Sequence, residues 1–172
     1  MGHLKIPQPP GEKHERDLIF SELREPKNWA YMAWALHNTA VRIDWTKNQN
    51  LNDWRYLPIY LMLMGFVLEN LLKGILIGQG QPLDPKKLNH GLKRYADQVK
   101  GLKFAEFEKE HLARLEPYVR WAGRYPMPKT SDDLIVIGHS KQFYNDEIAL
   151  CQKLYDHLRT LIQDLEPTSF SQ

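Results

Sequence analysis

The stretch from Leu57 to Gly78 constrains the fold of this chain more than any other part of the sequence. Pro58 fits the first turn of a helix, where its missing N–H costs nothing, and Gly78, Gly80 and the following Pro82 predict where the helix ends. Nearly every position between these ends is apolar, so this helix has no polar face to turn toward water. Such a helix lies at the centre of a bundle or inside a membrane.

Polar residues in the middle of this stretch decide between the two settings. A membrane-spanning helix needs roughly 20 apolar residues in a row, and Glu69, Asn70 and Lys73 interrupt the run before that length is reached. We therefore expect the central helix of a bundle and no membrane partner. Glu69 and Lys73 have the spacing and order that favour an ion pair, and unpaired charge is costly among apolar neighbours. These three residues are predicted to face a cleft between helices or a subunit interface.

The composition is that of one globular domain. The chain has 172 residues, 42% of them hydrophobic, which excludes a disordered polypeptide. A single Cys excludes an internal disulfide and a cysteine-rich zinc site. The first forty residues lack an apolar run after a basic start, so we expect a cytoplasmic protein.

Further helices are predicted from apolar residues that recur every three or four positions. A helix from about Pro26 has one buried stripe, widened by Trp34, Val41 and Trp45. The stripe consists of Trp29, Met32, Ala33, Leu36, Ala40 and Ile43. A short helix follows Asn89, its predicted N-cap, and ends at Gly101.

The last two predicted helices differ in regularity. One begins near Phe104, carries Phe107, His111, Leu115 and Tyr118 on one stripe, and should be kinked or interrupted by Pro117. The final helix has the clearest pattern, with two adjacent apolar stripes. They contain Tyr144, Ile148, Cys151, Tyr155, Leu158, Ile162 and Leu165, and Leu150, Leu154 and Leu161. Cys151 lies within a stripe, so we expect it in the core rather than as a nucleophile.

Together these patterns predict an all-α fold, an up-and-down bundle of four to five helices. An N-terminal arm would span residues 1–25, the bundle residues 26–166 and a tail residues 167–172. Residues 124–140, with two prolines, are predicted to form a long ordered loop before the last helix, and long loops in compact domains are often functional.

Charge is distributed unevenly along the chain. Residues 86–103 hold six basic residues against one acidic residue, whereas residues 131–166 hold three against seven. A basic middle can be the footprint of a polyanion. It can also complement the acidic last helix within or between protomers, or form an ordinary solvated surface.

Two histidines have plain structural interpretations. His37 lies among small apolar residues, which is typical of a buried or half-buried histidine with a hydrogen bond. Glu108 and His111 form one Glu-x-x-His, the spacing found in di-metal helical bundles. Those sites need two such motifs and two further Glu residues, and no second copy is present. We therefore expect no metal and no cofactor, and a core role for His111.

Three segments together resemble the HEPN-like helical bundles, a broad family of nucleotide- and RNA-associated domains. They are GFVLENLLKGILIG, then LNHGLKRYADQ, then YVRWAGRYPMP, and the resemblance covers residues 28–165. It implies four or five helices and a homodimer with a cleft across the dimer axis. Many members are metal-independent ribonucleases of toxin–antitoxin or antiviral systems, with an Arg followed by His after four to six residues. No Arg of this sequence has a His at that spacing.

The resemblance points to a small set of cleft residues. Glu69 and Lys73 match the central helix, His90 matches the turn after it, and Arg124 and Tyr125 match the Arg-Tyr-Pro segment. With Asn70 and Arg120 they are the predicted ligand-binding residues.

Our first hypothesis is a homodimeric binding module in a bacterial stress, toxin–antitoxin or defence setting. Its ligand would be a nucleotide, an RNA or a partner protein such as a cognate antitoxin or nucleotidyltransferase. One alternative is a divergent ribonuclease with His90 as acid or base and Arg124 stabilising the phosphorane charge. Another is a structural dimerisation domain.

Overall fold

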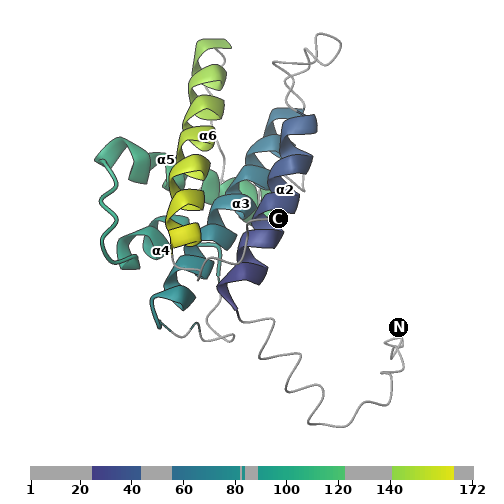
Figure 1. The fold of residues 1–172 in the computed structure, drawn as a ribbon. Helices are drawn as coiled ribbons and strands as arrows, with labels where there is room; N and C mark the ends of the chain where they lie inside the picture. Colours follow the sequence, from purple (N-terminus) through teal and green to yellow (C-terminus); the bar gives the residue numbers. More distant parts are fainter. Residues whose placement is uncertain (1–24, 44–55, 82, 84–88, 123–140, 165–172) are drawn as a thin grey trace, which may run out of the picture.

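The computed structural model describes residues 25–43, 56–81, 83, 89–122 and 141–164 (Figure 1). Within these residues the fold contains five α-helices, one π-helical turn and no strand, which confirms the predicted all-α bundle. The helices are α2 (Pro26–Arg42), α3 (Leu57–Gly78), α4 (Leu92–Gln98), α5 (Glu106–Pro117) and α6 (Lys141–Asp164), and the π-helical turn is η4 (Tyr118–Ala122). The predicted arm, the loop before α6 and the tail lie outside the described residues.

Helix α3 is the centre of the bundle, as its sequence predicts. It packs against α2, α4, α5, η4 and α6, and buried residues occur on every side of it (Figure 1). By length and composition α3 could cross a membrane, yet 67% of its most apolar window is buried within the protein. The neighbouring helices therefore supply the apolar surroundings that this helix requires.

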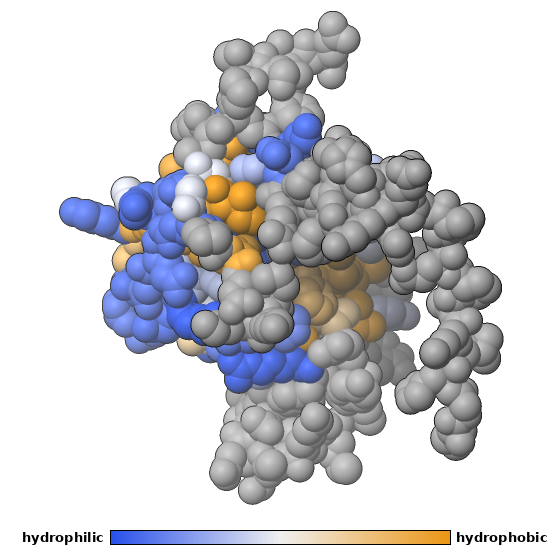
Figure 2. Space-filling view, turned by 90° about the horizontal axis from the view of Figure 1, so that it is seen from below, coloured by the Kyte–Doolittle hydropathy of each residue, from blue (hydrophilic) through white to orange (hydrophobic). Residues whose placement is uncertain are grey.

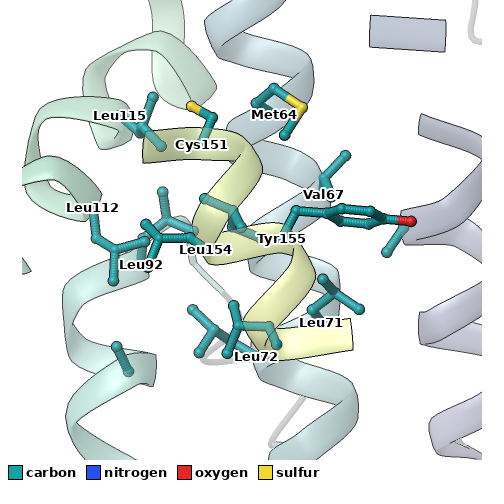
Figure 3. Close-up of a cluster of buried hydrophobic side chains, with 14 of the residues drawn as sticks. Met64, Val67, Leu71, Leu72, Leu92, Leu112, Leu115, Cys151, Leu154 and Tyr155 are labelled. Atoms are coloured by element: carbon teal, nitrogen blue, oxygen red, sulfur yellow. The ribbon is translucent and has the colours of Figure 1, made fainter. Parts of the chain in front are cut away.

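The core forms where α3, α5 and α6 meet. Leu154 of α6 points toward Leu92 of α4 and Leu112 of α5, whereas Tyr155 points the opposite way, past Val67 of α3 (Figure 3), and its ring stacks on His37 of α2 with the ring centroids 3.8 Å apart. Cys151, Leu158 and Ile162 are also buried, so the predicted apolar face of the last helix is confirmed. The breadth of this face is explained by the three described helices that α6 contacts, α3, α5 and α2.

The predicted buried stripe of α2 is only partly correct. Ala33 and Ala40 are fully buried, but Met32 and Trp34 are 51% and 50% exposed. Helix α2 lies at the edge of the bundle and packs mainly on α3 (Figure 1), so only a narrow strip of its surface is covered. The predicted widening by Trp34 is therefore wrong, and Trp45 lies outside the described residues.

The predicted buried stripe of α5 and η4 is confirmed at His111, Leu115 and Tyr118, but it is wrong at Phe107. Phe107 is 51% exposed, whereas Glu108 is buried at 6%. The Glu108 carboxylate accepts a hydrogen bond from the Ala105 N–H at 2.9 Å and forms an ion pair with Lys153 at 2.9 Å. A pattern that assigns charged residues to the surface cannot foresee this pairing, which makes burial of the carboxylate tolerable.

Two smaller predictions have different outcomes. Pro117 does interrupt its helix, because α5 ends there and the chain continues as the π-helical turn η4. Asn89 is not the N-cap of α4, which is Gly91. The Asn89 side chain instead accepts the Gly91 N–H at 3.1 Å, in a local turn that precedes the helix.

Two glycines let helices approach α3 closely. A Cβ on Gly65 would lie 2.3 Å from a methyl group of Val119, and one on Gly74 would lie 2.6 Å from Ile162 and 3.0 Å from Trp29. A larger residue at either position therefore requires the neighbouring side chains to shift, and at Gly74 the tight contact with Trp29 adds to this cost. Gly74 thus joins α2 and α6 to the same turn of α3.

Gly74→Ala should lower the free energy of unfolding by about 1–2 kcal/mol, because overpacking outweighs a gain of about 1 kcal/mol in helix propensity. Gly78→Ala, one turn later on the same helix and exposed, is the matched control and should be neutral or slightly stabilising. Urea unfolding of the two variants measures the difference. Equal stabilities would show that α2 and α6 do not pack on α3 as closely as described.

Candidate functional site

The carboxylate of Glu69 lies in the middle of α3 and is 5% exposed. Its Oε1 accepts a hydrogen bond from the ammonium of Lys73, one turn along the same helix. Its Oε2 lies 2.9 Å from Nδ1 of His90, a residue of the segment before α4. The structure therefore brings together three of the predicted site residues around one buried carboxylate.

Lys73 is as deeply buried as Glu69, at 5% exposure. Its Nζ lies 5.7 Å from the ring centroid of Trp29 on α2 and 5.1 Å from that of Tyr95 on α4. Aromatic faces attract a cation, and the Glu69 carboxylate balances its charge. Lys73 thus has a structural role, since it holds Glu69 in place and contacts both flanking helices.

His90 is the member of this cluster that reaches solvent, with 39% of its side chain exposed. A carboxylate only accepts hydrogen bonds, so Nδ1 carries the proton and donates a hydrogen bond to Glu69. The ring of Phe66 meets the imidazole edge-on at 5.8 Å and fixes its plane. Within the described residues, no group bonds to Nε2.

The turn that carries His90 also holds Arg94. The Asn89 side-chain oxygen accepts hydrogen bonds from the Gly91 N–H at 3.1 Å and from Nη2 of Arg94 at 3.0 Å. The Tyr95 hydroxyl donates to the Asn89 carbonyl at 3.1 Å, and its ring lies 5.1 Å from the Arg94 guanidinium carbon. The exposed Arg94 is therefore held by Asn89, the residue before His90, and by the Tyr95 ring.

Arg94 is absent from the residues that sequence reasoning singled out. The sequence analysis counts Arg94 only as one of the six basic residues in the stretch 86–103. Its spacing of four from His90, at the entrance to a helix, was an available signal. The hydrogen bond from Arg94 to Asn89 was not foreseeable, because Asn89 was assigned to a helix cap.

The other predicted site residues do not contact the Glu69 carboxylate or lie outside the described residues. Asn70 donates its side-chain N–H to the Phe66 carbonyl of its own helix at 2.7 Å, so it faces back onto α3. Arg120 forms an ion pair with Glu116 at 2.9 Å. Arg124 and Tyr125 lie outside the described residues.

A second polar cluster joins α5 to α6. Nε2 of the fully buried His111 lies 3.3 Å from the Cys151 sulfur, and Nδ1 makes an ion-pair contact of 3.0 Å with Glu147, without good hydrogen-bond alignment. Glu147 Oε1 accepts hydrogen bonds from Nε and Nη2 of Arg114, at 3.2 and 2.7 Å. This cluster pairs polar groups of α5 with polar groups of α6 and so links the two helices.

The thiol in this cluster is chemically inert. Burial raises the pKa of Cys151 far above its usual range, and the nearby Glu147 carboxylate raises it further. The thiolate that a nucleophile requires is therefore strongly disfavoured. Burial of both Cys151 and His111 confirms their predicted core positions. Among the described residues, no group of three His, Cys, Asp or Glu side chains is arranged to hold a metal ion.

Comparison of the chain with protein-family models, curated protein sequences and solved structures found no match. The HEPN-like resemblance therefore stays a prediction from three short segments. The features that bear on function are the cluster of Glu69, Lys73 and His90 and the neighbouring Arg94, which Asn89 holds.

The second cluster predicts a dependence of stability on acid. Burial alone would raise the pKa of Glu147, but the close contact with His111 and the hydrogen bonds from Arg114 outweigh it and hold this pKa below the ordinary value of 4.5. A carboxyl with a lowered folded-state pKa stabilises the fold fully above pH 4.5, and this contribution is lost as pH falls through the folded-state pKa.

Glu147→Gln should therefore flatten the loss of stability below pH 4.5 and cost about 1–2 kcal/mol at neutral pH, since Arg114 keeps an oxygen acceptor but loses its charged partner. Thermal melts from neutral to acidic pH measure both effects. The exposed Glu110→Gln on α5 is the control. Some acid sensitivity should remain, because the pKa of Glu108 is also lowered: its bonds to Lys153 and Ala105 outweigh burial. An unchanged pH profile in Glu147→Gln would refute the pairing.

The buried pair in α3 predicts strong energetic coupling. Lys73→Met should cost about 3–5 kcal/mol, because it leaves the Glu69 carboxylate buried with His90 as its one described side-chain partner. The double variant Glu69→Met with Lys73→Met should lose less than the sum of the single losses, by about 1–3 kcal/mol. Chemical unfolding of all four proteins gives the coupling energy. Strictly additive losses would show that the two charges do not interact.

Proposed function

We propose that this chain is a helical module that binds RNA at the surface formed by His90 and Arg94. The observation that carries the proposal is the hydrogen bond from His90 Nδ1 to the buried Glu69, which leaves Nε2 of a half-exposed imidazole without a described partner. A histidine held in this way can accept a hydrogen bond from a ligand at Nε2. The arrangement supports a ligand that presents a hydroxyl close to a negative charge.

RNA presents both groups in each nucleotide. When the imidazole is neutral and Nδ1 carries the proton, Nε2 has a lone pair and can accept a hydrogen bond from a hydroxyl. The 2′-hydroxyl is the group by which a protein distinguishes RNA from DNA. His90 is therefore proposed to accept the ribose hydroxyl, with Glu69 fixing the tautomer that can do so.

Arg94 is suited to the neighbouring phosphate. One nitrogen of its guanidinium is used by Asn89, and the remaining N–H groups of this exposed side chain can donate to phosphate oxygens. Bracing by Asn89 and by the Tyr95 ring reduces the entropy lost on binding. The two side chains thus combine hydroxyl and phosphate recognition on one turn.

The surrounding surface favours an anionic ligand. Lys93, Lys100 and Lys103 belong to the same basic stretch as Arg94, and Asp97 is its one acidic residue. Hydrophilic residues gather on the side of the molecule where α4 and α5 lie (Figures 1 and 2). Such basic stretches contribute sequence-independent attraction that salt weakens. This setting fits the HEPN-like resemblance, in which His90 follows the helix with Glu69 and Lys73.

A ribonuclease is the second candidate, and it rests on the same histidine–carboxylate pair. A carboxylate that orients an imidazole is the arrangement by which histidine acts as a general base. Nε2 would take the proton of the 2′-hydroxyl, whose oxygen attacks the adjacent phosphorus. The bond to the 5′-oxygen breaks, leaving a 2′,3′-cyclic phosphate and, once protonated, a 5′-hydroxyl. Arg94 would stabilise the charge that develops on the phosphoryl oxygens.

The proposal predicts selective binding of single-stranded RNA over DNA of the same sequence, measured by fluorescence anisotropy. His90→Ala should weaken RNA binding about tenfold and remove the preference over DNA, because a hydrogen bond of roughly 1.4 kcal/mol is lost. Arg94→Ala should weaken binding to both and lower the salt dependence. Arg159→Ala, an exposed arginine on α6, is the matched control and should bind like the wild type.

Equal affinity of the wild type for RNA and DNA would contradict the role given to His90. No binding to either would contradict the proposed function as a whole. Electrophoresis of the same RNA after incubation tests the second candidate. Cleavage that is lost in His90→Ala would make the chain a ribonuclease, whereas intact RNA leaves binding alone.

A further inference from the structure

Glu116, in the last turn of α5, holds the start of the neighbouring helix α4. Its Oε1 accepts the Lys93 N–H at 3.1 Å, and its Oε2 accepts a hydrogen bond from Nη2 of Arg120 at 2.9 Å. The Glu116 side chain is only 18% exposed, whereas that of Arg120 is 57% exposed. One carboxylate therefore places the Arg120 guanidinium beside the first turn of α4.

The backbone that carries Arg120 is firmly packed. Arg120 belongs to the π-helical turn η4, in which Tyr118 and Val119 are buried. Val119 lies against Gly65 of α3, where an added Cβ would come within 2.3 Å of its methyl group. Single π-helical turns occur frequently at functional sites. Arg120 is thus an exposed side chain on a turn that the core holds in place.

The start of α4 is held in the same way from a second side, and there too an arginine takes part. The Asn89 oxygen accepts the Gly91 N–H and also binds Arg94. The two backbone N–H groups held by Asn89 and Glu116 lie two residues apart, and His90 directly precedes the first of them. Because both N–H groups have acceptors, an anion at this place would be bound by the two guanidinium groups and not by the end of the helix.

From this arrangement we infer that the nucleotide bound by His90 carries a phosphate on each side of its ribose, one bound by Arg94 and the other by Arg120. The inference rests on the proposed RNA binding and defines the unit of RNA that the site takes. The 3′-phosphate adjoins the 2′-hydroxyl that His90 accepts, so it belongs to Arg94 of the same turn. The 5′-phosphate lies across the ribose and belongs to Arg120.

The charges around this turn make the second phosphate contact a local one. Lys93 pairs with Asp97 at 3.6 Å, and Arg120 pairs with Glu116. With Arg94 these side chains carry three positive and two negative charges, which is no broad basic surface. A guanidinium has five N–H donors and can bind a carboxylate and a phosphate together. Arg120 is therefore a partner for one defined phosphate.

The test is the binding of three nucleotides to the full chain, measured by titration calorimetry. They are adenosine 3′,5′-bisphosphate, adenosine 3′-monophosphate and adenosine 5′-monophosphate. The bisphosphate should bind about tenfold more tightly than either monophosphate, because it uses both arginines. Arg120→Ala should remove this gain and leave the affinity for the 3′-monophosphate unchanged, whereas Arg94→Ala should weaken the 3′-monophosphate. Arg42→Ala, an exposed arginine on α2, is the matched control and should bind all three like the wild type.

Equal affinity of the wild type for the bisphosphate and the 3′-monophosphate would overturn the inference. Bisphosphate binding that Arg120→Ala does not weaken would overturn it too, as would the absence of binding by all three nucleotides. The thermal melt of Arg120→Ala should match that of the wild type, since an exposed ion pair adds little stability. None of these failures decides RNA binding itself, which the comparison of RNA with DNA in wild type and His90→Ala tests separately.

Discussion

The bundle depends on the pairing of one buried carboxylate, that of Glu69. Helix α3 is apolar around its whole circumference and must be covered by its neighbours, yet this charge sits in its middle. A carboxylate in such surroundings is tolerated only with partners close by. Lys73 supplies one from the same helix and His90 supplies another from the segment before α4. The pairing stabilises the centre of the fold and also fixes the orientation of the histidine proposed to bind a ligand.

The two histidine–carboxylate clusters show how exposure separates structure from function. His111 meets Glu147 and Cys151 in the core and is fully buried. His90 meets Glu69 in a similar way, but 39% of its side chain is exposed. The first arrangement can only hold α5 to α6, whereas the second keeps one nitrogen within reach of solvent.

Features that depend on spacing along one helix can be predicted from the sequence, whereas features that depend on neighbouring helices cannot. The ends of α3 and the pairing of Glu69 with Lys73 belong to the first kind. The exposure of Phe107 and Trp34 belongs to the second, since it depends on how much of α5 and α2 other helices cover. Burial of Glu108 depends on Lys153, forty-five residues later in the chain. The position of Arg94 depends on the Asn89 side chain, whose local bond replaces the predicted helix cap.

Observation of the His90 imidazole nitrogens by ¹⁵N NMR, with and without a short single-stranded RNA, shows which nitrogen carries the proton and which one meets the RNA. We expect the neutral ring to carry its proton on Nδ1, and RNA to shift the Nε2 resonance while Nδ1 stays bonded to Glu69. In the double variant Glu69→Met with Lys73→Met, which removes the acceptor of Nδ1, the preference for this tautomer should disappear. A proton on Nε2 in the free wild-type protein, or an Nε2 resonance that saturating RNA does not move, would contradict the proposed role of His90.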